Sequence, residues 1–137
     1  MEHDSVARAG IERSIAALEQ AQIREDIDTL VSYYAENFVM RRHGEPDTRG
    51  REGIRATWEE NFAGWAYERP LLTIDRFTSN GSLAVVGGLV GGTLREKKPG
   101  APTQHFELPY LASWIRSEDG RWLLRDLMVL PPAPAAK

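Results

Sequence analysis

Residues 84–94, AVVGGLVGGTL, hold two glycine pairs within an otherwise aliphatic run. A phosphate-binding loop of the G-x-x-x-x-G-K-[ST] type needs a lysine after its last glycine and a helix behind it, and this stretch lacks the lysine. The dinucleotide fingerprint G-x-G-x-x-G also fails, because the spacing here is GGxxGG. Glycine inside a strand marks a bend, a bulge or a close approach between backbones. The stretch therefore predicts one long strand that curls and gives its sheet a concave face.

Apolar residues recur at helical spacing in the first half of the chain and at strand spacing in the second. The patterns predict helices over residues 11–22, 24–36 and 51–65, the second capped by Asp26, and strands over 38–42, 71–79, 82–96, 104–117 and 122–130. Because the helices precede most strands, we expect an α+β fold, with an antiparallel sheet packed on three N-terminal helices. We expect residues 1–137 to form a single domain, with its core over about 10–130 and a flexible tail over 131–137.

Composition excludes several classes of protein. The chain has 137 residues, no cysteine and a net charge of −3, with acids and bases intermixed. A nucleic-acid-binding protein would carry a basic stripe, and thiol chemistry is impossible here. No apolar run is long enough to cross a membrane and the N-terminus is too polar for a signal peptide, so we expect a cytoplasmic protein. The histidines are scattered at positions 3, 43 and 105, so we predict no metal site, and we expect no cofactor.

Three segments carry a family resemblance. YAENFVMRRHGEPDTRGREGI (residues 34–54) resembles the tyrosine-alanine-acidic stretch, strand, turn and helix start of the ketosteroid isomerase and SnoaL-like group of the nuclear transport factor 2-like superfamily. SLAVVGG (82–88) and YLASWIRSEDGRWLLRDL (110–127) look like its sheet half. The resemblance implies a cone-shaped curved, mixed sheet around a long helix, a deep apolar pocket and a homodimer. It does not specify an activity, because the fold hosts isomerases, dehydratases, cyclases, epoxide hydrolases and binders.

The resemblance also implies where the steroid isomerase residues would fall. The catalytic aspartate falls at Arg42, the oxyanion tyrosine at Leu18, the oxyanion aspartate at Leu111 and a further network tyrosine at Trp58. The catalytic residues are therefore replaced, and we expect a pocket without the steroid isomerase mechanism.

Arg42 and Asp126 are the first candidate catalytic residues. Alternation along the strand places Arg42 on one face with Phe38 and Met40, as a cation in an apolar cavity that needs an acidic partner or an anionic substrate group. Asp126 shares a predicted face with Trp122 and Leu124, so desolvation would raise its pKa and a nearby arginine would lower it. The alternatives are a surface arginine and a structural ion pair.

His105 and Glu107 form a second candidate pair that could move a proton near neutral pH. They share a strand face with Leu111 and Ser113, which the resemblance places inside the pocket. The opposite face, with Phe106, Leu108, Tyr110 and Trp114, is more apolar. That face is either a dimer interface, or Pro109 forms a bulge that reverses the alternation.

The predicted pocket walls come from helices and strands. Tyr34, Trp58 and Phe62, all expected on helices, would stack on a planar ligand, although each residue type more often only packs a core. The complete set of expected substrate-binding residues is Leu18, Tyr34, Phe38, Met40, Trp58, Phe62, Leu111 and Ser113.

These residues support competing functions. The first is a cofactor-independent acid-base enzyme (an isomerase, cyclase, dehydratase or epoxide hydrolase) that acts on a hydrophobic cyclic carbonyl or epoxide compound. The second is a small-molecule-binding protein without catalysis, and the third is a protein–protein adaptor. For the first two, the partners that we expect are a hydrophobic ligand and a second copy of the chain, with no nucleic acid and no membrane.

Overall fold

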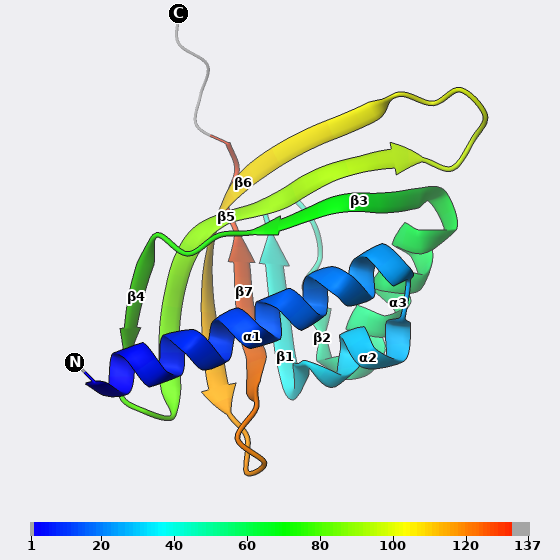
Figure 1. The fold of residues 1–137 in the computed structure, drawn as a ribbon. Coiled ribbons are helices and arrows are strands. Elements are labelled where there is room, and N and C mark those ends of the chain that lie inside the picture. Colours follow the sequence, from blue (N-terminus) through cyan, green and yellow to red (C-terminus); the bar gives the residue numbers. More distant parts are fainter. Residues whose placement is uncertain (1, 133–137) are drawn as a thin grey trace, which may run out of the picture.

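The computed structural model describes residues 2–132, and Figure 1 shows their fold. Three helices and seven strands lie in this range. In chain order they are α1 (Glu2–Arg24), α2 (Ile27–Ser32), β1 (Tyr34–Arg42), β2 (Thr48–Arg49), α3 (Gly50–Gly64), β3 (Trp65–Leu72), β4 (Arg76–Ser79), β5 (Leu83–Glu96), β6 (Thr103–Arg116) and β7 (Trp122–Val129). Most of the expected flexible tail, residues 133–137, lies outside the described residues.

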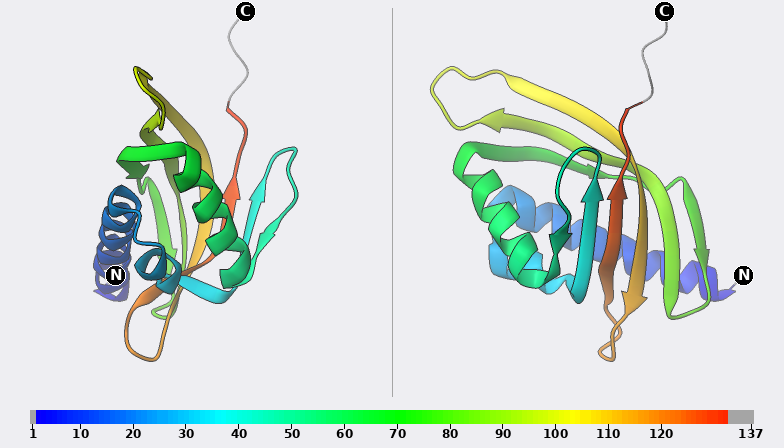
Figure 2. Two further views of the ribbon diagram at one scale, coloured as in Figure 1. Left: turned by 90° about the vertical axis from the view of Figure 1, so that its right-hand side faces the viewer. Right: turned by 180° about the vertical axis from the view of Figure 1, so that it is seen from behind.

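All seven strands belong to one curved sheet that does not close on itself. The order is β2-β1-β7-β6-β5-β3, and β4 pairs with β5 beyond the end of β3. The β1–β7 pair is parallel and the other pairs are antiparallel. The α+β class and the curved mixed sheet are thus confirmed. Figures 1 and 2 show α1 crossing the sheet, where it packs on β3, β4 and β7, whereas α3 packs on β1, β2 and β3.

The apolar stripe of α1 explains where this helix lies. Ile11, Ile15 and Leu18 recur at helical spacing and are buried. Within this stripe, the Ser14 hydroxyl donates a hydrogen bond of 2.8 Å to the carbonyl of Trp122 in β7. A side chain at Gly10 would lie 2.5 Å from the indole of Trp122, so only glycine allows this contact. The helix is therefore held against the sheet at a defined point.

The second helix is shorter than the sequence pattern predicts. Asp26 caps it as expected, accepting a hydrogen bond of 3.2 Å from the Thr29 backbone N–H. The expected continuation to residue 36 is wrong, because the Leu124 backbone N–H donates to the carbonyl of Tyr33 and β1 begins at Tyr34. Parallel pairing with β7 takes these residues out of the helix, and Tyr34 is a strand residue.

The boundary between the third helix and the next strand also differs from the prediction. Trp65 was expected on the helix but begins β3, which pairs with β5 along its whole length. Pro70 lies within this strand, opposite Gly92. A proline is tolerated there because β3 is an edge strand, whose free side needs no N–H donor. The predicted strand over 71–79 is broken at Thr73–Asp75, where the Thr73 hydroxyl accepts a hydrogen bond from the Leu89 backbone N–H.

The glycines of β5 allow the strand to bend between close neighbours, as predicted. Gly91 and Gly92 have φ of +146° and +129°, values that side-chain-bearing residues rarely adopt. A Cβ at Gly92 would lie 2.2 Å from the carbonyl oxygen of Arg69 in β3, and one at Gly88 would lie 2.1 Å from that of Thr73. Neighbouring backbones therefore occupy the space that side chains would need. Beyond the bend, the β5–β6 hairpin extends past β7, while β3 stays paired with β5 as far as Glu96 (Figure 1).

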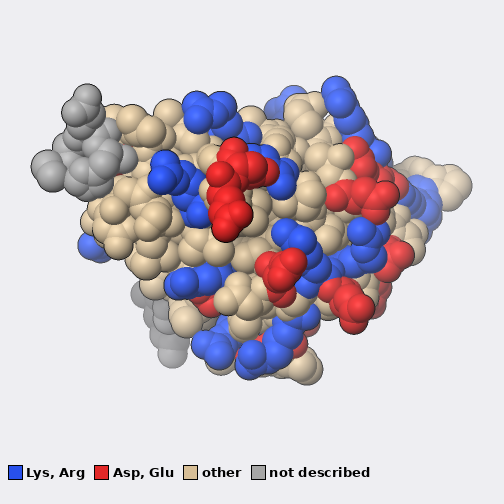
Figure 3. All heavy atoms as spheres, turned by 90° about the horizontal axis from the view of Figure 1, so that it is seen from below, with Lys and Arg blue, Asp and Glu red and all other residues tan. Residues whose placement is uncertain are grey.

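The surface shows no segregation of charge over the face drawn in Figure 3, where basic and acidic groups are interspersed. No helix in the described part of the chain is both long and apolar enough to cross a membrane.

Replacing Gly92 by alanine tests the bend. Gly92→Ala should lower the free energy of unfolding by at least about 2 kcal/mol, because the new Cβ meets backbone atoms at a positive φ. Gly64→Ala is the matched control, since nothing lies within 4 Å of that position, and it should stay within about 0.5 kcal/mol of wild type. Urea denaturation measures both; equal effects would mean that β5 does not need this glycine.

Candidate functional site

A cavity of about 390 Å³ lies between α1, α3 and the concave part of the sheet. Its walls are mainly apolar and come from α1, α3 and five strands. The residues that line it are Ile15, Leu18, Glu19, Gln22, Tyr34, Met40, Arg42, Glu45, Ile54, Thr57, Trp58, Asn61, Tyr67, Pro70, Leu71, Leu72, Val90, Gly91, Phe106, Leu108, Leu124, Leu127 and Val129. A mostly apolar hollow with a few polar groups is the usual form of a small-molecule site.

Several sequence-predicted residues meet in this cavity. Leu18, Tyr34, Met40 and Trp58 line it together with Arg42. Phe38 is fully buried and packs edge-on against Tyr34, so it supports the wall without reaching the cavity. Phe62 is likewise buried behind Trp58, with ring centroids 5.2 Å apart. Both are core residues, and neither lines the cavity, where the sequence analysis expected them.

Tyr34 and Trp58 are joined by a hydrogen bond at the cavity wall. The Trp58 indole N–H donates to the Tyr34 hydroxyl oxygen over 3.2 Å. Burial raises the pKa of Tyr34 to about 12, so its hydroxyl stays neutral at physiological pH. Tyr67 packs edge-on against Trp58, and burial also raises its pKa. The aromatic wall thus presents neutral hydroxyl groups.

Glu19 is a cavity carboxyl that the sequence analysis missed. It lies on α1 beside Leu18 and lines both this cavity and a shallow outer groove between α1 and residues 72–74. Burial raises its pKa, and a backbone hydrogen bond from Leu72 opposes the rise only in part. The available signal was its spacing, because Glu19 is four residues after the buried Ile15 and hence on the same helix face.

Arg42 points into the cavity, as the alternation along β1 predicted. Its side chain is 35% exposed, and its Nε lies 3.3 Å from the Glu45 carboxylate. Val39 and Arg41 lie on the other side of the sheet, in an outer hollow. The turn after β1 therefore places one ion pair at the edge of the cavity.

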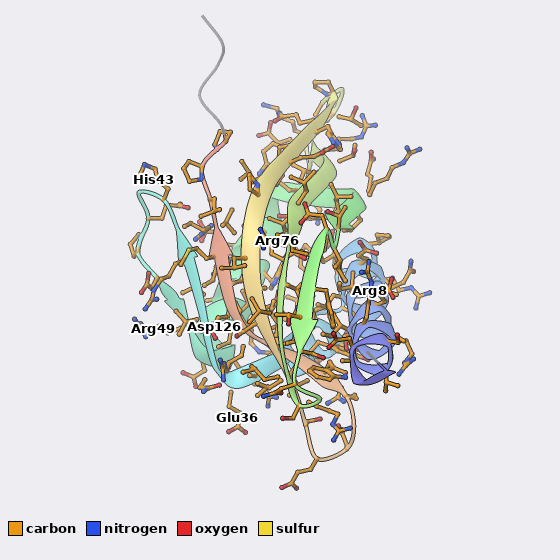
Figure 4. The ribbon with its side chains drawn as sticks, turned by 90° about the vertical axis from the view of Figure 1, so that its left-hand side faces the viewer. Arg8, Glu36, His43, Arg49, Arg76 and Asp126 are labelled. Carbon is orange, nitrogen blue, oxygen red and sulfur yellow. The ribbon has the colours of Figure 1, made fainter. Side chains whose placement is uncertain are left out.

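Asp126 does not lie in the cavity, so the expected face is wrong. It lies on the sheet side away from α1 (Figure 4), where the Ser113 hydroxyl and the Arg125 Nε donate to its carboxylate. Burial alone would raise its pKa, but these bonds and the nearby arginines hold it below its usual range. The reason is a bulge: Ser113 opposes Asp126 while Trp114 opposes Leu124, so Arg125 is an extra residue that reverses the alternation.

His105, Glu107, Leu111 and Ser113 are also on the outer face, contrary to the implied orientation. The β5–β6 register runs without interruption through Pro109, so the suggested bulge at that residue is absent. The apolar alternative face is the inner one: Phe106 and Leu108 line the cavity, and Tyr110 and Trp114 are buried. On the outer face, His105 contacts the Thr93 hydroxyl at 2.8 Å and the Glu107 carboxylate at 2.6 Å.

Residues 2–132 contain no group of three histidine, aspartate or glutamate side chains close enough to hold a metal ion. His43 lies in the exposed turn after β1 (Figure 4), and the side chain of His3 is outside the described part.

Comparison with known proteins agrees with this architecture. The family pattern described as SnoaL-like domain matches residues 11–124. A ketosteroid isomerase-like protein from Erwinia carotovora is 20% identical, with a TM-score of 0.73 over 92% of this chain and 96% of its own. A proposed dehydratase of the nuclear transport factor 2-like family from Streptomyces avermitilis is 18% identical, with a TM-score of 0.77 over 98% and 100%.

A proposed scytalone dehydratase from Novosphingobium aromaticivorans is 14% identical, with a TM-score of 0.75 over 93% and 85% of the two chains. Among curated proteins, none matches the chain. These three structural likenesses are distant and show the fold alone, whereas the family pattern covers most of the sequence. The chain therefore belongs to the SnoaL-like domain family.

Proposed function

We propose that the protein is a cofactor-independent enzyme that moves a proton on a hydrophobic cyclic carbonyl or epoxide compound bound in the cavity. The observation that carries the proposal is Glu19, a carboxyl of raised pKa in the wall of a largely apolar hollow. Such perturbed carboxyls are typical general bases and acids, because their pKa approaches the working pH. The dehydratase and isomerase names among the structural neighbours are compatible with this class of chemistry.

In this proposal Glu19 transfers the proton and Tyr34 stabilises the substrate oxygen. The ionised Glu19 accepts a proton from the carbon beside the substrate carbonyl, and later returns it. The Tyr34 hydroxyl oxygen already accepts the Trp58 N–H, so its own proton is directed to another acceptor. A substrate oxygen that gains negative charge would receive that proton in a hydrogen bond.

The structure does not favour Asp126, His105 or Glu107 for this role, because a side chain on the outer face cannot touch a molecule in the cavity. The outward position of Asp126 favours a second candidate, a binding protein without catalysis. Both candidates use the same cavity, and they differ in whether a bound ketone exchanges protons.

The exchange of carbon-bound protons tests the first candidate without knowledge of the natural substrate. Wild-type protein should speed deuterium exchange at the α-carbons of 2-tetralone, a fused-ring ketone, followed by NMR. Glu19→Gln should lose about 100-fold or more of this rate, the usual contribution of a general base. The wild-type rate should fall at acid pH with an apparent pKa above the ordinary glutamate value.

Glu12→Gln, on the same helix but lining only the outer groove, is the matched control and should keep the wild-type rate. Wild-type exchange no faster than buffer, with 2-tetralone bound, would favour the binding protein. Equal exchange by Glu19→Gln and wild type would remove Glu19 from the mechanism.

The pH dependence of folding stability tests independently whether burial raises the pKa of Glu19. A carboxyl whose pKa is raised by folding binds its proton more tightly in the folded state, so ionisation lowers stability as pH rises through that pKa. Glu19→Gln should therefore be more stable than wild type at pH 7, and the gain should vanish at about pH 4, near the unfolded value. Urea denaturation across this range measures it; wild type being the more stable at pH 7 would contradict the assignment.

We also infer that a second copy of the chain covers the outer face of the sheet. Val85, Leu111 and Met128 are exposed there around a shallow hollow of about 190 Å³. Arg41 and Asp126 line the same hollow, so a two-fold related copy can set the cation of one chain against the anion of the other. The apolar centre and the opposite charges suit self-association.

Placing a charge at the centre of this face should separate the copies. Leu111→Glu should be monomeric by light scattering at micromolar concentration, while the wild-type chain should be dimeric. Val6→Glu changes an exposed residue on α1 and should leave the dimer intact. A monomeric wild-type chain would overturn the inference.

A further inference from the structure

Arg42, which lines the cavity, has one side-chain donor without a hydrogen bond. Its Nε is buried and makes no hydrogen bond with any described residue, although Glu45 lies 3.3 Å away. A buried charged donor without a hydrogen bond costs free energy, so such groups normally have a well-aligned acceptor. The position of Arg42 therefore calls for an acceptor that the protein alone does not provide.

Glu45 is a weakly held partner for this arginine. It lies in the turn after β1, its side chain is 54% exposed, and its backbone N–H donates to the Arg42 carbonyl. Ion pairs of this exposure contribute little to stability, because water competes for both groups. A second anion with better geometry could replace the Glu45 carboxylate without disturbing the fold.

The other residues that line the cavity limit which kind of molecule could carry that anion. Arg42 is the only lysine or arginine among the cavity-lining residues of the described chain, and Glu19 and Glu45 are the only acids. An anionic group of a bound molecule is thus attracted by Arg42 and repelled by Glu19 and Glu45. Most other walls are apolar or aromatic, including Trp58, Leu71 and Leu108, so the remainder of the molecule must be hydrophobic.

We propose that the cavity selects an amphipathic acid: a cyclic hydrophobic compound with a carboxylate that docks on Arg42 and displaces Glu45. The planar guanidinium offers paired donors that suit a carboxylate. This inference rests on the proposed function, because it names the class of substrate for the same cavity. It assigns Arg42 to binding and orientation of the substrate, separate from the proton transfer by Glu19.

Matched pairs of probes isolate the contribution of the carboxylate. Binding of 1-naphthoate and 1-naphthamide, and of cyclohexanecarboxylate and its amide, is measured by calorimetry at pH 7. The wild-type protein should bind each acid at least tenfold more tightly than its amide. Acetate alone, which has the charge without the ring, should not compete at the concentrations that saturate naphthoate.

Three variants make the assignment specific. Arg42→Gln should abolish the preference for acid over amide and leave amide binding within twofold of wild type. Glu45→Gln should strengthen acid binding by about threefold or more, because the competing carboxylate is gone, with amide binding unchanged. Arg49→Gln, on the neighbouring strand β2 and outside both the cavity lining and the outer hollow, is the matched control and should retain the wild-type preference.

The outcomes separate this inference from the proposed function. Amides that bind as tightly as the acids would overturn the preference for an anion and leave the cavity and Glu19 as proposed. A preference that survives in Arg42→Gln would remove Arg42 as its cause. No binding of any probe would contradict the small-molecule cavity itself, and this inference with it.

Discussion

Close approach between backbones along β5 is the constraint on which the cavity depends. At Gly88 and Gly92, carbonyl groups of the neighbouring segment occupy the space that a Cβ would take. The strand can therefore bend while it stays paired with β6 on one side and with β3 and β4 on the other. Cavity-lining residues such as Leu71, Val90 and Phe106 flank this bend. The hollow is thus a consequence of the backbone, and the side chains determine what it can hold.

A single helix supports both the solid core and the hollow. The N-terminal part of α1 buries Ala7 and Ile11 and is fixed to β7 through Ser14 and Trp122. Farther along the helix, Leu18, Glu19 and Gln22 face the cavity. Because the first part is anchored, the second part cannot move inward to fill the space, and polar groups on it are held in a partly desolvated position. That arrangement raises the pKa of Glu19.

The two faces of the sheet carry different kinds of charged group. Inside, Glu19 and Arg42 come from separate elements and have few partners. Outside, Asp126, His105 and Glu107 are each bonded to neighbouring side chains and are 44–52% exposed. Ionisable groups on the inner face are therefore available to a bound molecule, whereas those on the outer face already stabilise one another. The contrast follows from the β5 bend and from one extra residue in β7.

The sequence by itself determined the class of fold, the curled strand at the glycine pairs and the inward position of Arg42, because these depend on local spacing and on glycine. It also located Leu18, Met40 and Trp58 at the cavity wall. Only the tertiary structure decided that Tyr34 begins a strand, since pairing with β7 overrides its helical pattern. Likewise, the bulge at Arg125 turns Asp126 outward, although no turn residue marks it. The desolvation of Glu19 depends on packing between α1 and β3, segments far apart in the chain, which no local pattern encodes.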